Sequence, residues 1–162
     1  MGKVVSYNYQ EALGRVEAFM KATGIRTYCE TICKGYCCRD CYGKSTACHV
    51  NEGRRLACSY FICLPLMYIV FTNSTDRGKY ESVGHAIHCS LTKAAENHQY
   101  ENHYFVPYTK KQMKAFRIRK SVFDKNMPTV DQMTSIANTM RYISSLANKV
   151  KGKRSENLLS WA

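Results

Sequence analysis

The sequence lacks a long hydrophobic run. Its longest apolar stretch, residues 56–71, spans 16 residues, contains Pro65 and two cysteines, and follows Arg54 and Arg55. A helix that crosses a bilayer needs about 20 consecutive apolar residues. We therefore expect a buried element here, and we do not expect a membrane as the partner.

An apolar leader is also missing at the start of the sequence. Residues 1–7 contain no hydrophobic core of the length that a secretory signal requires. We therefore expect an intracellular, cytoplasmic protein, in which clustered cysteines are more often metal ligands or reactive thiols than disulfides. If a leader were removed ahead of Met1, the nine cysteines would instead predict a disulfide scaffold with one odd thiol.

Acidic residues are scarce. The chain has 12 Asp and Glu against 24 Lys and Arg, which gives a formal net charge of +12 at pH 7. Most of the excess lies in residues 109–162, which carry twelve Lys and Arg and three acidic residues. Such a basic excess predicts an acidic partner, with nucleic acid first, an acidic protein second and anionic lipid third.

Familiar catalytic motifs are absent. No Ser/His/Asp pattern, glycine-rich phosphate loop or pair of catalytic carboxylates can be assigned. A Cys–His nucleophile pair stays open, because such residues meet in space and not in sequence. We therefore lean away from an enzyme and assign no catalytic residue.

Cysteine, in contrast, is abundant: eight of the nine cysteines lie between Cys29 and Cys63. A thiolate centre gathers several sulfurs at about 2.3 Å from one ion, and close spacing lowers the entropy of bringing them together. We predict such a centre, with zinc as the first candidate and an iron–sulfur cluster as the alternative. The candidate ligands are Cys29, Cys33, Cys37, Cys38, Cys41, Cys58 and Cys63, with Cys48 and His49 as further members.

The remaining candidate ligands are interpreted as structural. Cys89 stands apart from the other cysteines, and we expect it to be a small buried hydrophobe. The pairs His85–His88 and His98–His103 have spacings that a metal could use. We interpret them as surface or core residues.

Two blocks of the cysteine stretch resemble a known family. Cys33-Lys34-Gly35-Tyr36-Cys37-Cys38 and the later run 54–63, with Arg54, Cys58 and Cys63, are similar to the paired signatures of the YkgJ-type zinc- or iron-chelating family. The resemblance covers residues 29–63 and implies ligation by Cys29, Cys33, Cys37, Cys38, Cys58 and Cys63. The sequence departs from the pattern in the three residues between Cys29 and Cys33 and in Arg55, where the family has proline.

A basic run near residue 110 predicts the nucleic-acid contact. Its members are Lys110, Lys111, Lys114, Arg117, Arg119 and Lys120. Such side chains neutralise phosphates and release counterions, and the preceding aromatic residues could stack on unpaired bases. The alternative is a solvated face that keeps the protein soluble.

The expected fold is α+β or mainly helical, in a single metal-stabilised domain over 1–150 with a basic frayed tail over 151–162. Capping boxes predict an N-terminal amphipathic helix that starts at Asn8 and a C-terminal one that starts at Thr129. Between them we expect a buried strand over 64–72 with helix as the alternative, a turn over 73–78, a short strand or helix over 83–92, an extended segment over 100–108 and a helix over 109–120.

The features together predict an intracellular, zinc-like metal-binding basic protein that binds nucleic acid through its C-terminal third. One alternative is an iron–sulfur or zinc/iron-chelating enzyme or electron carrier. Another is an interaction protein of viral or mobile-element type, whose basic surface covers an acidic host protein.

Overall fold

The computed structural model describes residues 5–33, 52–93 and 109–160, with the side chains of 5–33, 55–92 and 109–150. These residues form a mainly helical single domain with eight helices and one two-stranded sheet. The mainly helical alternative of the predicted fold is thus confirmed, and the α+β alternative is not.

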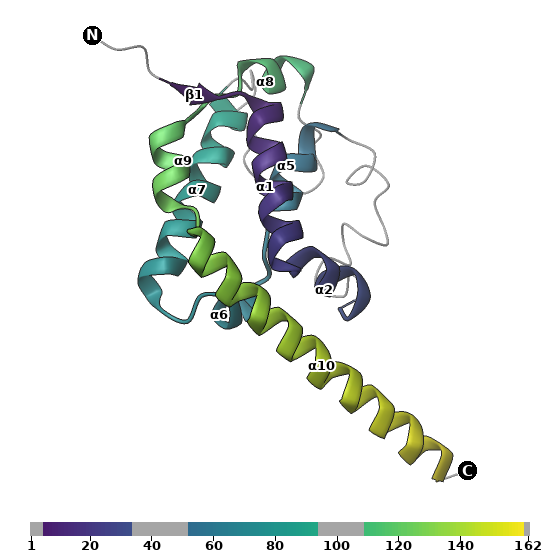
Figure 1. The fold of residues 1–162 in the computed structure, drawn as a ribbon. Coiled ribbons are helices and arrows are strands. Elements are labelled where there is room, and N and C mark those ends of the chain that lie inside the picture. The colour runs from purple at the N-terminus through teal and green to yellow at the C-terminus, as the bar shows by residue number, and fades with distance from the viewer. Residues whose placement is uncertain (1–4, 34–51, 94–108, 161–162) are drawn as a thin grey trace.

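The elements follow one another along the chain as shown in Figure 1. They are β1 (Ser6–Tyr7), α1 (Tyr9–Thr23), α2 (Ile25–Thr31), α5 (Glu52–Tyr60), α6 (Leu64–Val70), α7 (Ser74–Lys93), α8 (Lys110–Ala115), β2 (Ile118–Arg119), α9 (Lys120–Asn126) and α10 (Val130–Ser160).

Helix α1 lies at the centre of the domain and packs against α5 and α10 (Figure 1). Its predicted capping box is confirmed: Glu11 N donates to Asn8 Oδ1 over 2.9 Å, and Asn8 N donates to Glu11 Oε2 over 3.2 Å. The helix ends at Gly24, whose φ of 75° is the left-handed conformation that glycine adopts without strain.

A short sheet joins the start of the described chain to a segment more than 100 residues further along. Strand β1 pairs antiparallel with β2, with Ser6 opposite Arg119 and Tyr7 opposite Ile118. Lys120 N adds a hydrogen bond to Val5 O over 3.0 Å. The predicted helix over 109–120 is therefore wrong in its second half, because α8 ends at Ala115 and the following backbone pairs with β1.

The middle of the chain corrects two further predictions. Residues 64–70 form helix α6, so the expected strand is wrong and the helical alternative holds. The expected turn over 73–78 is the start of α7, where Asp76 N donates to Asn73 Oδ1 over 2.8 Å. Helix α7 continues through 83–92, which confirms the helical alternative there. The expected extended segment over 100–108 lies outside the described residues.

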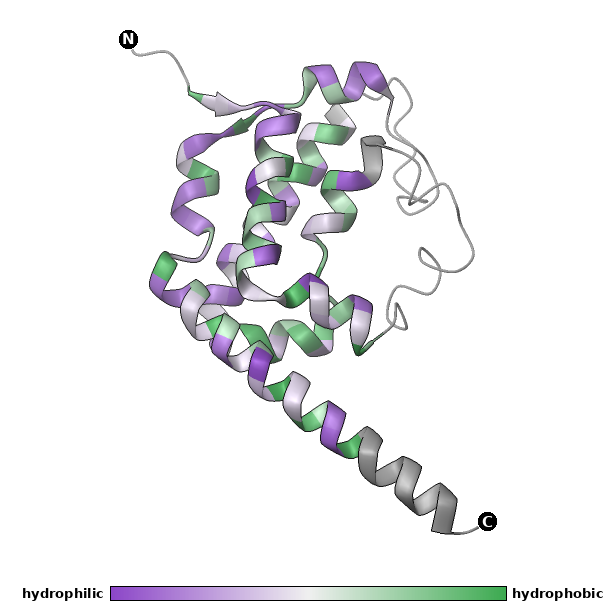
Figure 2. Cartoon of the chain, turned by 45° about the vertical axis from the view of Figure 1, so that its right-hand side comes forward, coloured by the Kyte–Doolittle hydropathy of each residue, from purple (hydrophilic) through white to green (hydrophobic). Residues whose placement is uncertain are grey.

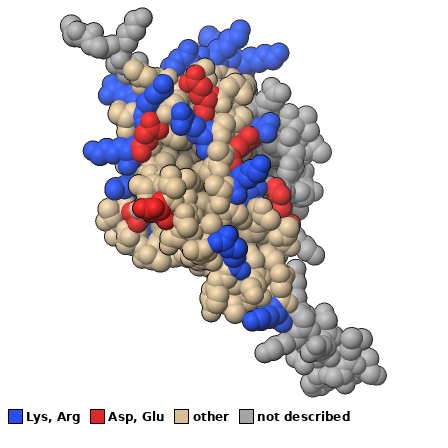
Figure 3. Space-filling view, in the orientation of Figure 1, with Lys and Arg blue, Asp and Glu red and all other residues tan. Residues whose placement is uncertain are grey.

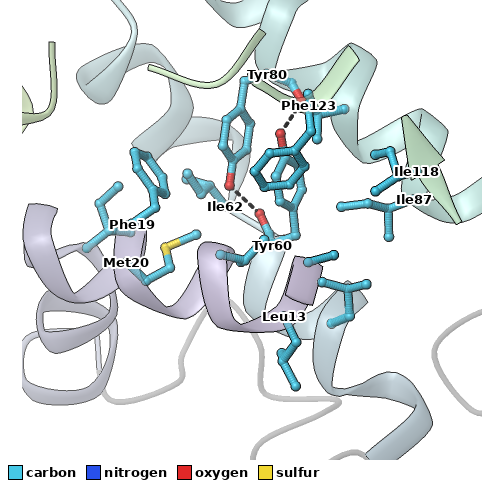
Figure 4. Close-up of a cluster of buried hydrophobic side chains, with 14 of the residues drawn as sticks. Leu13, Phe19, Met20, Tyr60, Ile62, Tyr80, Ile87, Ile118 and Phe123 are labelled. Atoms are coloured by element: carbon cyan, nitrogen blue, oxygen red, sulfur yellow. Dashed lines mark hydrogen bonds between the residues drawn. The ribbon is translucent and has the colours of Figure 1, made fainter. Parts of the chain in front are cut away.

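The described domain is built around an ordinary hydrophobic core (Figure 4). Side chains from α1, α5, α6, α7, α9 and α10 contribute to it, and the fully buried group in the described residues contains no cysteine. Burial of these apolar side chains stabilises the packing of the helices through the hydrophobic effect.

Helix α10 has two different halves. The capping box predicted at Thr129 and Gln132 is confirmed, and Ile136 and Met140 pack into the core. Beyond them the helix projects from the body, and Figure 2 shows hydrophobic residues recurring along it. The helix continues to Ser160, through most of the segment expected to be a frayed tail.

The long apolar stretch 56–71 is divided between the end of α5, a short connection and α6. Leu56, Leu66 and Val70 are buried as expected, whereas Leu64 and Tyr68 are exposed. None of the helices in the described part of the chain combines the length and apolar character needed to cross a membrane.

Candidate functional site

Four of the predicted thiolate ligands lie in described parts of the chain. Each is half-buried: Cys29 in α2, Cys33 just after it, Cys58 in α5 and Cys63 before α6. The other predicted ligands lie outside the described residues. They are Cys37, Cys38, Cys41, Cys48 and His49.

Arg26 brings the two ends of the cysteine stretch into one region. Its Nη2 donates to Ser59 O over 2.7 Å and to Cys58 O over 3.3 Å, so α2 is held against the C-terminal end of α5. Residues 26 and 29 are three apart on α2 and share one side of that helix, whereas Cys33 follows its end. The side of α2 that carries Cys29 therefore lies next to the segment that carries Cys58.

The described thiols do not make a complete metal site by themselves. Within the described ranges, no three His, Cys, Asp or Glu side chains lie close enough together to hold an ion. Cys29 and Cys63 pack against the hydrophobic core instead. Thiolates are the ligands that zinc and iron–sulfur clusters use, so the donor chemistry fits, but a complete site would need further ligands from the undescribed part of the stretch.

Cys89 is not the buried residue that we expected. It lies on the solvent side of α7, and its Sγ is 3.4 Å from Nε2 of His85, which is also exposed. The interpretation as packing is therefore wrong. The reason is the phase of α7: Ile87 and Leu91 face the core, which turns residues 85 and 89 outward.

The basic run forms a surface at one end of the molecule (Figure 3). We call it the basic face, and it consists of Lys110, Lys111, Lys114, Arg117, Arg119 and Lys120. All are exposed except Lys120, which is half-buried. They come from α8, the connection, β2 and α9, so no single helix presents them as the sequence predicted.

One member of the basic face already has a structural role. Arg117 Nη1 donates to Phe116 O over 2.6 Å and to Lys114 O over 3.1 Å, which closes the end of α8. Its backbone N donates to Ser90 Oγ over 3.0 Å, and that hydroxyl donates back to Arg117 O over 3.0 Å. Arg117 is therefore less available for phosphate than predicted.

Three members of the basic face are uncommitted. Among the described residues, the side chains of Lys110, Lys114 and Arg119 form no hydrogen bond and no ion pair. The ion pair seen among the described residues lies outside the basic face and joins Arg55 of α5 to Glu17 of α1 over 2.7 Å. Unpaired, exposed cations can approach a polyanion without first breaking a contact.

A buried tyrosine adds a residue that the sequence did not indicate. The ring of Tyr7 is only 3% exposed, and the Arg15 guanidinium carbon lies 4.2 Å from its centroid, with Lys120 Nζ at 5.1 Å. The hydroxyl of Tyr7 donates to both carboxylate oxygens of Asp124 over 2.9 Å. Burial and this hydrogen bond raise the pKa of Tyr7, while Arg15 lowers it.

Arg15 therefore adds a positive charge beside the basic face, and Asp124 adds a negative one. No local signal in the sequence could have shown this, because β1 and β2 bring together residues more than 100 positions apart. Exposed Glu11 lies near the same tyrosine. The charge at this end is thus positive overall but contains two carboxylates.

Comparisons of the chain with protein-family models, with curated proteins and with solved structures found no match. The resemblance of residues 29–63 to the YkgJ-type family stays a prediction that rests on its own residues.

Proposed function

We propose that this chain is a zinc-like metal-binding basic protein that binds nucleic acid through the basic face. The observation that supports it most is the presence of exposed Lys and Arg in α8, in the connection and in β2 at one end of the molecule, with Lys110, Lys114 and Arg119 uncommitted among the described residues. Arg15 extends the same surface. Each phosphate that these side chains neutralise releases counterions, which favours binding.

Sequence specificity needs more than this surface. Phosphate contacts position a protein on nucleic acid, whereas base contacts distinguish sequences. Among the described residues, the aromatic rings of Tyr7 and Phe116 at the basic face are buried and cannot stack on a base. The proposal is therefore binding that depends on charge, with little preference among sequences.

The metal has a separate role in this proposal. Thiolates from both ends of the cysteine stretch would hold one or more ions, and the Arg26 link between α2 and α5 supports this by placing those ends in one region. A structural zinc contributes free energy to folding. Here it would attach the cysteine stretch to a body that has a hydrophobic core of its own. Zinc remains the first candidate and an iron–sulfur cluster the alternative.

Fluorescence anisotropy with a labelled duplex and a labelled single strand tests the binding. The variant Lys110→Glu/Lys114→Glu/Arg119→Glu should weaken both complexes and lower the slope of log K against log salt by about 3 for the duplex. Lys21→Glu/Lys79→Glu/Arg141→Glu is the matched control, because it makes the same change in charge elsewhere. Equal losses in the two variants would show only a response to net charge.

Elemental analysis of protein purified without oxygen tests the metal. About one or two zinc ions per chain are expected from the number of thiolates. Visible absorption near 400 nm would indicate that the centre holds an iron–sulfur cluster instead of zinc. If the purified protein contains no metal and its cysteines form disulfides, the proposed metal centre is wrong. The nucleic-acid proposal does not depend on this result and is tested by the anisotropy measurement.

A second candidate function is supported by α10. Its projecting half exposes Tyr142, Leu146 and Val150 at helical spacing, with 65%, 41% and 52% of their surfaces accessible. The sequence from 132 to 155 contains five Lys and Arg and no acidic residue. An apolar stripe with basic flanks suits an acidic amphipathic helix of another protein. The +12 net charge disfavours a second copy of the chain.

Titration with a synthetic acidic amphipathic peptide separates this candidate from the first. Tyr142→Ser/Leu146→Ser/Val150→Ser should abolish peptide binding and leave nucleic-acid binding unchanged. Leu64→Ser/Tyr68→Ser changes exposed apolar residues on α6 and serves as the control. Loss of nucleic-acid binding in the α10 variant would instead assign this helix to the first function.

A further inference from the structure

His85 and Cys89 on α7 are a pair of side chains of the types that can ligate a metal, outside the cysteine stretch. They are four residues apart on α7, so their side chains lie on the same side of the helix. Cys89 Sγ is 3.4 Å from His85 Nε2, and both residues are exposed. The two ligand atoms are thus near one another and reachable from solvent.

The distance between these atoms agrees with chelation of one ion. Tetrahedral zinc holds sulfur at about 2.3 Å and imidazole nitrogen at about 2.1 Å, so the two ligand atoms lie about 3.6 Å apart. The observed separation is 3.4 Å. A zinc ion therefore needs only small side-chain rotations, and the backbone of α7 does not have to move.

The helix that carries the pair is held firmly on its other side. Ile87 and Leu91 are buried, and Gln112 Nε2 donates to Leu91 O over 3.0 Å. Ser90 exchanges hydrogen bonds with the backbone of Arg117, the residue directly before β2. These contacts fix the phase of α7, so the positions of residues 85 and 89 are set before an ion arrives. Such preorganisation favours binding.

We propose that His85 and Cys89 form a surface site for a zinc-like divalent ion. The ligands would be the Cys89 thiolate and the neutral imidazole of His85, and the thiol proton would pass to solvent when the ion binds. No third ligand from the described residues completes the site. Two of four tetrahedral positions would therefore remain for water or for a donor atom from a bound molecule.

The proposal differs from a simple hydrogen bond between thiol and imidazole, which the same distance allows. A hydrogen bond would not respond to zinc, whereas a zinc-bound thiolate is withdrawn from alkylation. The test follows the rate at which N-ethylmaleimide modifies Cys89 in the full-length protein, read from its peptide by mass spectrometry, with increasing zinc.

Zinc at about ten times its Kd should slow modification of Cys89 about tenfold, because only the unliganded thiol reacts. The variant His85→Asn should lose this protection, and His88→Asn, a change on the same helix, should retain it. Rates that do not change up to about 1 mM zinc, a weak Kd for any specific ligand, would overturn the proposal. Protection that persists in His85→Asn would do the same.

Cys58 and Cys63 are followed in the same digest and report on the proposed thiolate centre. Their protection without protection of Cys89 would support that centre and reject this surface site. Protection of Cys89 without protection of Cys58 and Cys63 would reject the thiolate centre and leave the surface site supported. Because both His85 and Cys89 are exposed, circular dichroism of His85→Asn should match the parent, which separates loss of a ligand from loss of the fold.

Discussion

Tyr60 and Tyr80 each donate a hydrogen bond to the other's backbone carbonyl. Tyr60 Oη lies 2.5 Å from Tyr80 O, and Tyr80 Oη lies 2.6 Å from Tyr60 O. The rings stack with centroids 4.2 Å apart and planes 8° apart (Figure 4). This reciprocal pair joins α5 to α7 and satisfies two buried hydroxyls that would otherwise destabilise the core.

The tyrosine pair predicts that the fold loses stability at alkaline pH. Burial raises the pKa of Tyr60 and of Tyr80 above the ordinary value of 10.0. Above pH 10 the unfolded chain releases these protons and the folded chain keeps them, so unfolding becomes easier as pH rises. The free energy of unfolding should fall by about 1.4 kcal/mol per pH unit for each such tyrosine.

Urea unfolding between pH 9 and pH 11 measures this slope. Tyr60→Phe should make it shallower and should lower stability at neutral pH by about 1 kcal/mol through the lost hydrogen bond. Tyr142→Phe, at an exposed position, is the control and should change neither quantity. A slope that is the same in Tyr60→Phe and in the parent would contradict this account.

Gly84 predicts a second effect of the same pair. A Cβ at this position would lie 3.1 Å from Cε1 and 3.4 Å from Cδ1 of Tyr60, a ring that its stacking and hydrogen bond hold in place. Gly84→Ala should therefore lower stability, by about 1–3 kcal/mol for an overpacked site. Gly78 lies in the same helix with nothing within 4 Å of its Cβ position. Gly78→Ala should raise stability by about 1 kcal/mol, and thermal unfolding of the two variants should shift in opposite directions.

The hydrogen bonds of Arg26 lead to a prediction that connects the stability of the fold with its affinity for zinc. Arg26→Met keeps the apolar stem and removes the hydrogen bonds to Cys58 O and Ser59 O. The loss should cost about 1.5–3 kcal/mol, because a charged donor is involved. If the thiolate centre spans α2 and α5, zinc affinity should fall about tenfold as well, as for other residues that orient ligands. Lys21→Met, also in the α1–α2 region, is the control; an unchanged zinc affinity in Arg26→Met would place the centre elsewhere.

The parts of the fold that depend on neighbouring residues could be predicted. The capping boxes that begin at Asn8, Thr109 and Thr129 are all present, because each needs only a side chain and a backbone group three residues away. The end of the helix over 109–120 could not be predicted, because it depends on pairing with β1, far away in sequence. The start of α7 was missed for another reason: Asn73 has the residue type of a turn and acts as a helix cap.

The interior of α7 did carry a signal in the sequence. Tyr80, Val83, Ile87 and Leu91 recur at spacings of three and four and are all buried. Reading that stripe would have extended the helix and turned residues 85 and 89 to solvent. In the candidate site, too, only local features could be predicted. The basic run was found from composition, whereas the position of Arg15 beside Tyr7 depends on contacts between α1 and the sheet, which residue spacing does not show.

Asp124 predicts opposite effects on stability and on binding. Its carboxylate accepts the Tyr7 hydroxyl with both oxygens over 2.9 Å, and Lys120 lies over the same ring. Asp124→Asn keeps an acceptor but loses the charge, so stability should fall by about 1 kcal/mol. The same change removes a negative charge beside the basic face, so affinity for nucleic acid should rise a few-fold at low salt. Asp131→Asn, at the start of α10, makes the same change in charge outside the basic face. A rise of equal size in both variants would assign the effect to net charge, whereas a rise confined to Asp124→Asn would place the bound phosphates beside Tyr7 and Lys120.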